Sequence, residues 1–251
     1  MKQKIAVITG GSRGLGRDMA INLAKDGVDI IFTYHSNQKS ADEVISLIKQ
    51  LGQNAKAFPY DANNPNEAKA LVTNLTSYLK QEYNSTNFDF LINNAGTGTF
   101  NLIADTSESQ FDDMMNIHLR SAYFLTQAAL PFLNEGGRII NISSGLARFS
   151  LPGMSAYAIM KGGLEVFTRY LAKELGSRKI TANVIAPGAI ATDFAGGSNK
   201  DPEKSTMIAS ITALGRVGEA EDVGGTVAFL CSERAGWING QRIEVSGGML
   251  V

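Results

Sequence analysis

The sequence predicts an α/β fold in which helices cover both faces of one doubly wound, mainly parallel sheet. Short β-branched apolar runs alternate with longer helical patterns along the chain. Runs such as Ile5–Ile8 are continuously hydrophobic, as in strands that are buried on both faces. No linker rich in Ser, Gly or Pro divides the 251 residues, so we expect a single domain over residues 1–251.

Seven strands and six helices follow from this pattern. A closed barrel of eight strands is the alternative architecture, and the loop after the first strand favours the open sheet. The strands are predicted at Lys4–Thr9, Val28–Tyr34, Ala55–Tyr60, Phe88–Asn93, Gly137–Ser143, Ile180–Ala186 and Gln241–Val245. The helices are predicted over residues 14–26, 38–52, 65–83, 108–134, 155–176 and 219–232. The glycine-rich, polar segment 193–215 breaks the rhythm, and we interpret it as a mobile substrate loop, with a tolerated surface insertion as the alternative.

Composition excludes several classes of function. With 23 basic and 24 acidic side chains, the chain lacks the basic footprint of a nucleic-acid-binding protein. A single Cys and two His provide neither an internal disulfide nor a metal site. The segment Met1–Gly11 holds an apolar run of only four residues, too short for a signal peptide, and no run is long enough to span a membrane. We therefore expect a cytoplasmic protein.

A glycine-rich loop joins the first strand to the first helix. In Gly10-Gly11-Ser12-Arg13-Gly14-Leu15-Gly16, Gly10 can take the tight turn, Gly14 lets the backbone approach a pyrophosphate and Gly16 allows close helix–sheet packing. The order G-x-x-x-G-x-G departs from the strict G-x-G-x-x-G fingerprint. We interpret the loop as a dinucleotide site, with a glycine turn that binds no ligand as the alternative.

The residues after the second strand indicate NADPH rather than NADH. Tyr34-His35-Ser36-Asn37 offers no carboxylate for a ribose 2′-hydroxyl, and Asp29 opens the strand, about 16 Å from the required end. Arg13 can pair with a 2′-phosphate, and Ser36 and Asn37 can add hydrogen bonds. A solvated surface charge is the alternative role of Arg13.

Tyr157 and Lys161 stand four residues apart in a helical stretch, so they share one helix face. An ammonium group close to the phenol could lower its pKa toward neutral pH and make it a general acid. A pair at this spacing is also common on helix surfaces. The preceding strand ends at Ser143-Ser144, at the carboxyl edge where open α/β sheets bind ligands, and this favours the catalytic interpretation.

Together these motifs resemble the short-chain dehydrogenase/reductase family over essentially the whole chain, most closely its 3-oxoacyl-acyl-carrier-protein reductases. The resemblance implies a Rossmann-type sheet of seven strands in the order 3-2-1-4-5-6-7. Further segments that carry it are Asn93-Asn94-Ala95-Gly96, Asn116, Pro187-Gly188, Gly215-Arg216-Val217-Gly218 and Gly240–Gly248.

The resemblance also implies the roles of the site residues. Tyr157 would protonate the carbonyl oxygen, Ser144 would hydrogen-bond it, and Lys161 would lower the Tyr157 pKa and hold the nicotinamide ribose. Asn116 would shape a kinked helix and hold a water that relays protons to Lys161. The expected cofactor contacts are Gly10, Ser12, Arg13, Gly14, Leu15, Gly16, Tyr34, His35, Ser36, Asn37, Asp61, Ala62, Asn93, Ala95, Gly96, Tyr157, Lys161, Pro187, Gly188, Ile190 and Thr192.

We expect hydride transfer between NADPH and the carbonyl of a small apolar ketone, or the reverse oxidation of a secondary alcohol. The Tyr-x-x-x-Lys spacing disfavours enoyl reduction, because related enoyl reductases have a longer gap. Ser144, Leu146, Met154 and Phe194 would form the substrate pocket. The alternatives are a 3-oxoacyl-acyl-carrier-protein reductase and a non-catalytic NADPH-binding regulator.

Two further features bear on partners. Arg178 matches one carrier-docking arginine of the resembled reductases, but Glu135 stands near the other position with the wrong sign. The predicted helix 155–176 is apolar nearly all round, which implies a second buried face. Because family members usually pair this helix and helix 108–134 across subunits, we expect a homotetramer, with no nucleic-acid or membrane partner.

Overall fold

Seven parallel strands form one sheet in the order β3-β2-β1-β4-β5-β6-β7, which confirms the predicted fold and strand order. The computed structural model describes residues 3–251. Met1 and Lys2, part of the N-terminal segment considered above, lie outside the described residues. The strands are β1 (Ile5–Ile8), β2 (Asp29–Tyr34), β3 (Ala55–Pro59), β4 (Phe88–Asn93), β5 (Leu133–Ile142), β6 (Thr181–Pro187) and β7 (Arg242–Val245).

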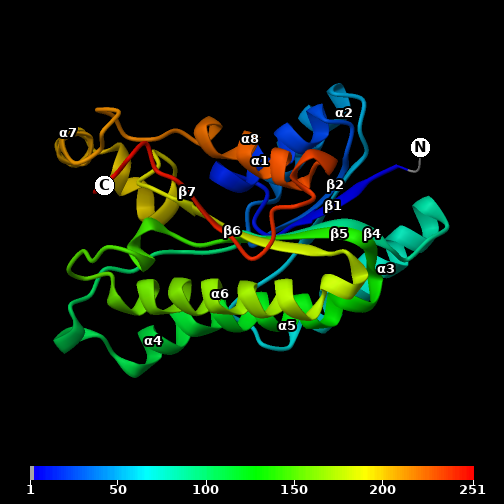
Figure 1. Cartoon of the computed structure of the whole chain (residues 1–251), viewed down its shortest axis with the longest axis horizontal. Coiled ribbons are helices and arrows are strands. Elements are labelled where there is room, and N and C mark those ends of the chain that lie inside the picture. The colour runs from blue at the N-terminus through cyan, green and yellow to red at the C-terminus, as the bar shows by residue number, and fades with distance from the viewer. Residues whose placement is uncertain (1–2) are drawn as a thin grey trace.

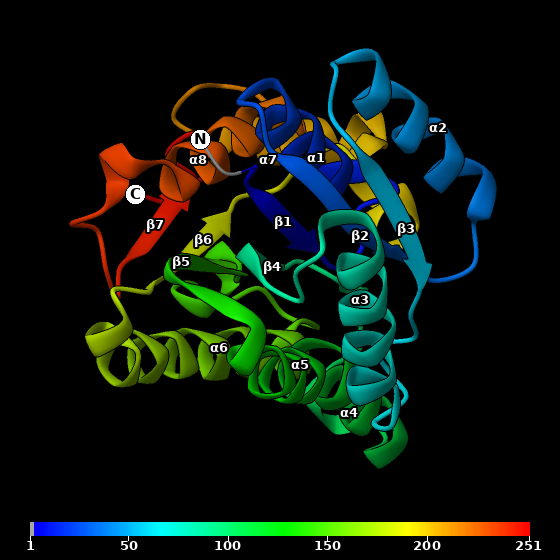
Figure 2. The same cartoon turned by 90° about the vertical axis from the view of Figure 1, so that its right-hand side faces the viewer.

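The helices cover both faces of the sheet (Figures 1 and 2). One apolar core lies between the sheet and α1, α2 and α8, and a second lies between the sheet and α3, α5 and α6. The fold is thus a three-layer sandwich, and the strands buried on both faces explain the continuous apolar runs. The helices are α1 (Gly14–Lys25), α2 (Gln38–Gln50), α3 (Glu67–Tyr83), α4 (Glu108–Met115), α5 (Ser121–Ala129), α6 (Ser155–Glu174), α7 (Pro202–Ser210) and α8 (Glu221–Cys231).

The predicted helix 108–134 is not continuous. A π-helical turn, η2 (Asn116–Arg120), separates α4 from α5, and the 3₁₀ turn Leu130–Phe132 follows α5. Pro131 has no N–H for the helical ladder, so the helix ends there. Strand β5 consequently begins at Leu133, earlier than predicted, and its register against β4 shifts between Phe88 and Phe90.

The segment 193–215 contains a helix that the sequence interpretation missed. Asp201 accepts a hydrogen bond from the Lys204 backbone N–H at 3.0 Å, and Pro202 occupies the first turn of α7. An Asp-Pro pair is a regular helix-start signal, so this helix was open to prediction. The start of the segment is irregular, with positive φ at Ala195, Gly196 and Gly197. Within residues 3–251, no helix is both long and apolar enough to cross a bilayer.

Candidate active site

The site lies where the strand order reverses, at the carboxyl ends of β1 and β4. The loops after these strands are tied together by Thr9 and Asn94. The Thr9 hydroxyl accepts the backbone N–H groups of Asn94 and Ala95, both at 2.9 Å, and the Asn94 amide donates to the carbonyls of Thr9 (2.8 Å) and Gly10 (3.1 Å). Ligands of open α/β sheets bind at this switch point.

The glycine loop forms a cradle that side chains would fill. A Cβ atom on Gly16 would lie 2.1 Å from the Gly10 carbonyl oxygen, and Gly10 and Gly14 have φ of +69° and +52°. A Cβ on Gly14 would lie 3.4 Å from the Cβ of Thr192, so the loops after β1 and β6 approach each other here. With the N-terminus of α1 facing this space, the residues present fit a pyrophosphate.

The residues at the end of β2 include no carboxylate that could bind the hydroxyl groups of a ribose. His35, Ser36 and Asn37 are exposed, as is Arg13. The side-chain oxygen of Asn37 accepts the Ser40 N–H at 3.1 Å and caps α2, so the amide of Asn37 has a structural use as well.

The carboxylates of Asp61 and Asp29 differ in their surroundings. The Asp61 carboxylate lies 3.9 Å from His35 Nε2 and also accepts the Asn63 N–H at 2.9 Å. Asp29 is buried at the opposite end of the strand, where it accepts hydrogen bonds from Asn54 (2.8 Å) and Tyr83 (2.9 Å). Asp29 is therefore structural.

The structure brings Ser144, Tyr157 and Lys161 together. Ser144 follows β5, and its hydroxyl caps the next turn by accepting the Leu146 N–H at 3.2 Å. Tyr157 and Lys161 come from the first turns of α6, and the Lys161 Nζ lies 5.4 Å from the centre of the Tyr157 ring. Lys161 donates to the Ile142 carbonyl at 2.7 Å, which fixes its ammonium end beside the strand that carries Ser144.

Burial dominates the pKa values of this pair. Burial raises the pKa of Tyr157 to about 12, and a hydrogen bond with Ser144 opposes the rise. Burial also lowers the pKa of Lys161 to about 7. The expected effect of Lys161 on the Tyr157 pKa stays a prediction, since burial is the main cause of both shifts in this structure. Tyr157 keeps its proton at neutral pH, which suits a proton donor.

A partly buried ion-pair network contacts the backbone of Ser144. Arg242 of β7 binds Glu165 and Glu244, both at 2.7 Å, and donates to the Ser144 carbonyl at 3.2 Å. Glu165 also accepts the Ser143 hydroxyl at 2.8 Å. No local sequence pattern predicts this network, because its members come from segments that are distant in sequence.

Two predicted site residues, Asn93 and Asn116, have different surroundings. The Asn93 amide donates to Thr126 (3.0 Å) and Asn141 (2.8 Å), so its side chain turns into the core rather than toward an adenosine. Asn116 opens the π-helical turn, is partly exposed and makes no side-chain hydrogen bond within residues 3–251. Its proton-relay role stays a prediction. His118, two residues on, is 2% exposed and packs against Tyr157.

The wall beside Tyr157 is apolar. The Phe194 ring lies 5.9 Å from the Tyr157 ring, and Leu146 and Met154 pack against a cluster that contains Tyr157. Phe194 also approaches Gly98 in the loop after β4. Three loops, after β4, β5 and β6, therefore meet beside the phenol.

The predicted cofactor contacts that follow β6 lie in one backbone-bonded segment. Ile190 is 8% exposed and pairs with Gly218, while the Gly188 N–H donates to the Val245 carbonyl at 3.0 Å. Thr192 faces Gly14. The segment Pro187–Thr192 is thus held by backbone contacts between the glycine loop and Tyr157.

The comparisons with known proteins agree with this geometry. A family model described as Enoyl-(Acyl carrier protein) reductase matches residues 10–250. The chain is 36% identical to the 3-oxoacyl-[acyl-carrier-protein] reductase FabG of Staphylococcus aureus, over 98% of each chain, and 34% identical to the hydroxynaphthalene reductase-like protein Arp2 of Metarhizium brunneum, over 98% of this chain and 94% of that one. The angucycline C-6 ketoreductase LanV with bound NADP superposes with a TM-score of 0.94 at 35% identity, covering 98% of this chain and 95% of that one.

The chain therefore belongs to the short-chain dehydrogenase/reductase family and is an oxidoreductase. Its relatives share both the fold and nearly the full length of the chain.

Proposed function

We propose that the protein reduces an apolar, ring-containing ketone to a secondary alcohol with NADPH. One observation carries this proposal: the protonated Tyr157 phenol stands beside Ser144 at the carboxyl edge of the sheet, under the ring of Phe194. The cofactor is NADP(H), the class bound in the LanV structure. When bound, it supplies the hydride that adds to the carbonyl carbon.

The chain's own groups handle the oxygen and its proton. The Ser144 and Tyr157 hydroxyls both bind the carbonyl oxygen, and Tyr157 donates its proton as negative charge develops there. Lys161, held by the Ile142 carbonyl, would bind the nicotinamide ribose. The glycine loop and α1 N-terminus would hold the pyrophosphate, Arg13 a 2′-phosphate, and Ile190 and Thr192 the carboxamide.

The substrate side favours a free ketone over a carrier-bound thioester. Arg178, the candidate carrier contact, donates to the backbone carbonyls of Leu130 and Leu133. Glu135 lines the same surface hollow as Arg178 and would repel an acidic carrier. The aromatic ring of Phe194 offers a flat surface on which a planar substrate can stack.

Cofactor consumption across a panel of ketones tests the proposal. The panel contains a bicyclic aryl ketone such as 1-tetralone, a small aliphatic ketone, and acetoacetyl thioesters with and without carrier protein. We expect NADPH to be oxidised faster than NADH and the bicyclic ketone to be preferred. Tyr157→Phe should lower kcat by about 10³-fold or more while NADPH still binds, because only the proton donor is removed.

Two outcomes would contradict the proposal. A rate on the thioester that rises when carrier protein is attached would show a carrier-protein reductase. Tight NADPH binding without turnover on any carbonyl would show a regulator.

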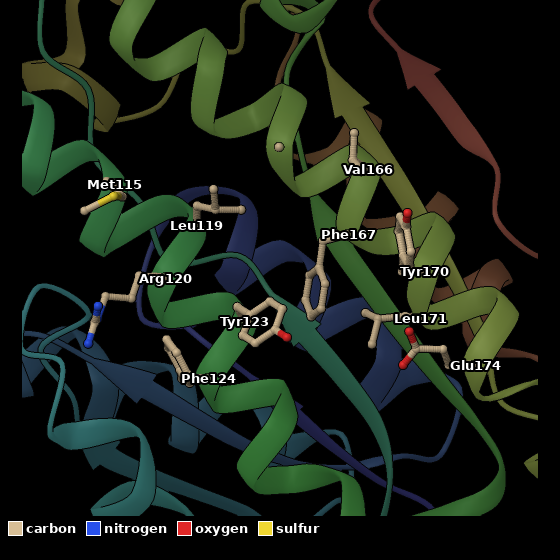
Figure 3. Close-up of a pocket in the computed structure, with 11 residues that line it drawn as sticks. Met115, Leu119, Arg120, Tyr123, Phe124, Val166, Phe167, Tyr170, Leu171 and Glu174 are labelled. Atoms are coloured by element: carbon tan, nitrogen blue, oxygen red, sulfur yellow. The ribbon is translucent and has the colours of Figure 1, made fainter.

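We also propose that the protein assembles as a homotetramer in which the groove between α5 and α6 forms one of the two-fold interfaces (Figure 3). The groove has a volume of about 460 Å³, and its exposed side chains are mostly apolar or aromatic, among them Tyr123, Val166 and Tyr170. Arg120 and Glu174 lie at opposite ends of it in Figure 3. A two-fold axis through the groove would place each Arg120 near the Glu174 of a second copy. We therefore propose that a second copy of the chain binds in the groove.

Charge reversal tests this interface. Arg120→Glu and Glu174→Arg should each shift the assembly toward smaller species, and the double variant should restore it, because only the double variant recovers opposite charges across the two-fold axis. Sedimentation velocity measures the species present. A wild-type protein that sediments as a monomer, or a double variant no better than the single ones, would contradict the proposed pairing.

A further inference from the structure

His118 is a buried titratable residue next to the reacting phenol. It lies in the π-helical turn η2, and its ring meets the Tyr157 ring edge-on, with centres 4.9 Å apart and planes at 86°. The titratable groups that face it are Tyr157 and Lys161 of α6, while the loop after β4 presents Thr97 and Gly96. Short π-helical insertions occur frequently at functional sites.

The hydrogen bonds of His118 define its tautomer. Nε2 lies 2.7 Å from the Thr97 carbonyl oxygen, which can only accept, and 3.4 Å from the Thr97 backbone nitrogen, whose N–H could only donate to it. The much shorter contact is the one to the carbonyl, and we therefore assign the hydrogen to Nε2. Burial, with Lys161 adding to it, holds the pKa of His118 well below its usual range. The ring is therefore neutral at physiological pH, and Nδ1 is left as an acceptor with a free lone pair.

Two buried acceptors at this place have no partner among the protein groups of the described chain. They are His118 Nδ1 and the side-chain oxygen of Asn93. A buried acceptor without a hydrogen-bond partner destabilises the fold, so such a pair calls for a donor. The hydrogen bond that Lys161 Nζ makes within the described chain goes to the Ile142 carbonyl instead.

One small cavity joins these groups. It has a volume of about 10 Å³ and is lined by His118, Asn93 and Lys161, among other residues. A cavity of roughly this size holds one water molecule when two to four polar partners surround it. A water here can donate to Nδ1 and to the Asn93 oxygen while it accepts from Lys161.

We propose that His118, rather than Asn116, holds the buried water that returns a proton to the Tyr157–Lys161 pair after each reduction. This inference rests on the proposed function. In each turnover Tyr157 gives its phenolic proton to the substrate oxygen. Lys161 returns a proton to the phenolate, and the water passes one to Lys161 and is itself reprotonated from solvent. The net change is the uptake of one solvent proton, and His118 stays neutral throughout.

Replacement of His118 tests the relay. His118→Leu removes both ring nitrogens and should lower kcat for the ketone about 100-fold, with KM and the NADPH Kd within about threefold of the wild type. The solvent deuterium isotope effect on kcat should rise, because proton return becomes rate-limiting. His118→Asn, which keeps an acceptor, should recover at least a tenth of the lost rate.

Matched variants separate the relay from packing. Met114→Leu changes a buried apolar side chain in the cluster that contains Tyr157, and it should keep both kcat and the isotope effect. Asn116→Leu should lose less activity than His118→Leu. If His118→Leu does not fold, the comparison of His118→Asn with His118→Gln carries the test, because both retain an acceptor and should both retain an active relay.

The failure of this inference is distinct from that of the proposed function. A wild-type enzyme that turns over ketones, together with a folded His118→Leu variant of unchanged kcat and isotope effect, would overturn the relay alone. A greater loss in Asn116→Leu than in His118→Leu would overturn it in favour of Asn116. A wild type without turnover would instead refute the proposed function.

Discussion

The two ends of the site differ in the chemical groups that form them. At the phosphate end, the glycine loop presents backbone N–H groups, and its side chains are small or exposed. At the proton-transfer end, the structure buries Tyr157, Lys161 and His118 at 8%, 4% and 2% exposure. The first end is shaped by backbone conformation, and the second by the desolvation of titratable groups.

This difference predicts opposite relations between function and stability. At the phosphate end, the geometry that binds the ligand is also the geometry in which helix and sheet pack, so a harmful change should damage both. At the proton-transfer end, buried titratable groups cost stability that a packed apolar side chain would not. A harmful change there should impair the chemistry and stabilise the fold.

Gly16→Ala should give the largest effect at the phosphate end. The new Cβ would meet the Gly10 carbonyl oxygen at 2.1 Å, and backbone would have to move. We expect NADPH affinity to fall about 100-fold or more and stability to fall by about 1–3 kcal/mol. Fluorescence titration and thermal unfolding measure the two quantities.

Gly225→Ala is the matched control for this change. Gly225 lies on an open face of α8 with nothing within 4 Å of a new Cβ. The free energy of unfolding of the Gly225→Ala variant should exceed that of the wild type by about 0.4–1 kcal/mol, because alanine restricts the unfolded chain and favours the helix. If Gly16→Ala bound NADPH as tightly as the wild type, the prediction that packing and ligand binding depend on the same geometry at this end would be wrong.

Lys161→Met should give the opposite pattern. The pKa of Lys161 falls from about 10.5 unfolded to about 7 folded, so at pH 6 the folded protein must hold a charged, buried amine. Removing it should stabilise the protein by about 1–3 kcal/mol at pH 6, even after the loss of the bond to the Ile142 carbonyl, while turnover is lost.

The pH dependence of this gain has a definite sign. Between pH 7 and 10.5 the unfolded state binds more protons at Lys161 than the folded state, so wild-type stability rises with pH relative to the variant. The advantage of Lys161→Met should therefore shrink above pH 7. Unfolding in urea across this range measures it, and a constant advantage would show that the amine is not the cause.

The same contrast explains what the sequence could reveal. The alternation of strands and helices, the glycine loop and the Tyr157–Lys161 spacing depend on local patterns, whereas the strand order followed from the family resemblance. The structure confirms the sheet and brings that pair beside Ser144. That Asp29 does not bind the cofactor ribose also follows from its position at the start of the strand. In the structure, its carboxylate accepts hydrogen bonds from Asn54 and Tyr83.

The rest depends on tertiary packing. The periodicity of residues 108–134 cannot show that a π-helical turn forms there, and this turn carries His118, whose ring packs against Tyr157. The Arg242 network joins β5, α6 and β7 in a way that no local pattern encodes. Burial, which sets the pKa values of Tyr157 and Lys161, is likewise a property of the whole fold.

Arg13→Ala tests the one place where the phosphate end uses a charged side chain. Arg13 is exposed, and Asp193, whose pKa is lowered by Lys200 and to a smaller degree by Arg13, lies close to it. We expect kcat/KM for NADPH to fall about tenfold while that for NADH stays the same, since a solvent-exposed pair with a phosphate contributes modestly.

Arg17→Ala, an exposed arginine one turn further along α1, is the matched control and should leave the NADPH/NADH ratio unchanged. Because Arg13 is exposed and makes no side-chain cap to α1, its removal should also leave thermal stability unchanged. The ratio would then change without the stability, which separates this side chain from the backbone cradle around it. If the ratio stays the same in Arg13→Ala, the preference for NADPH must come from the residues that follow β2.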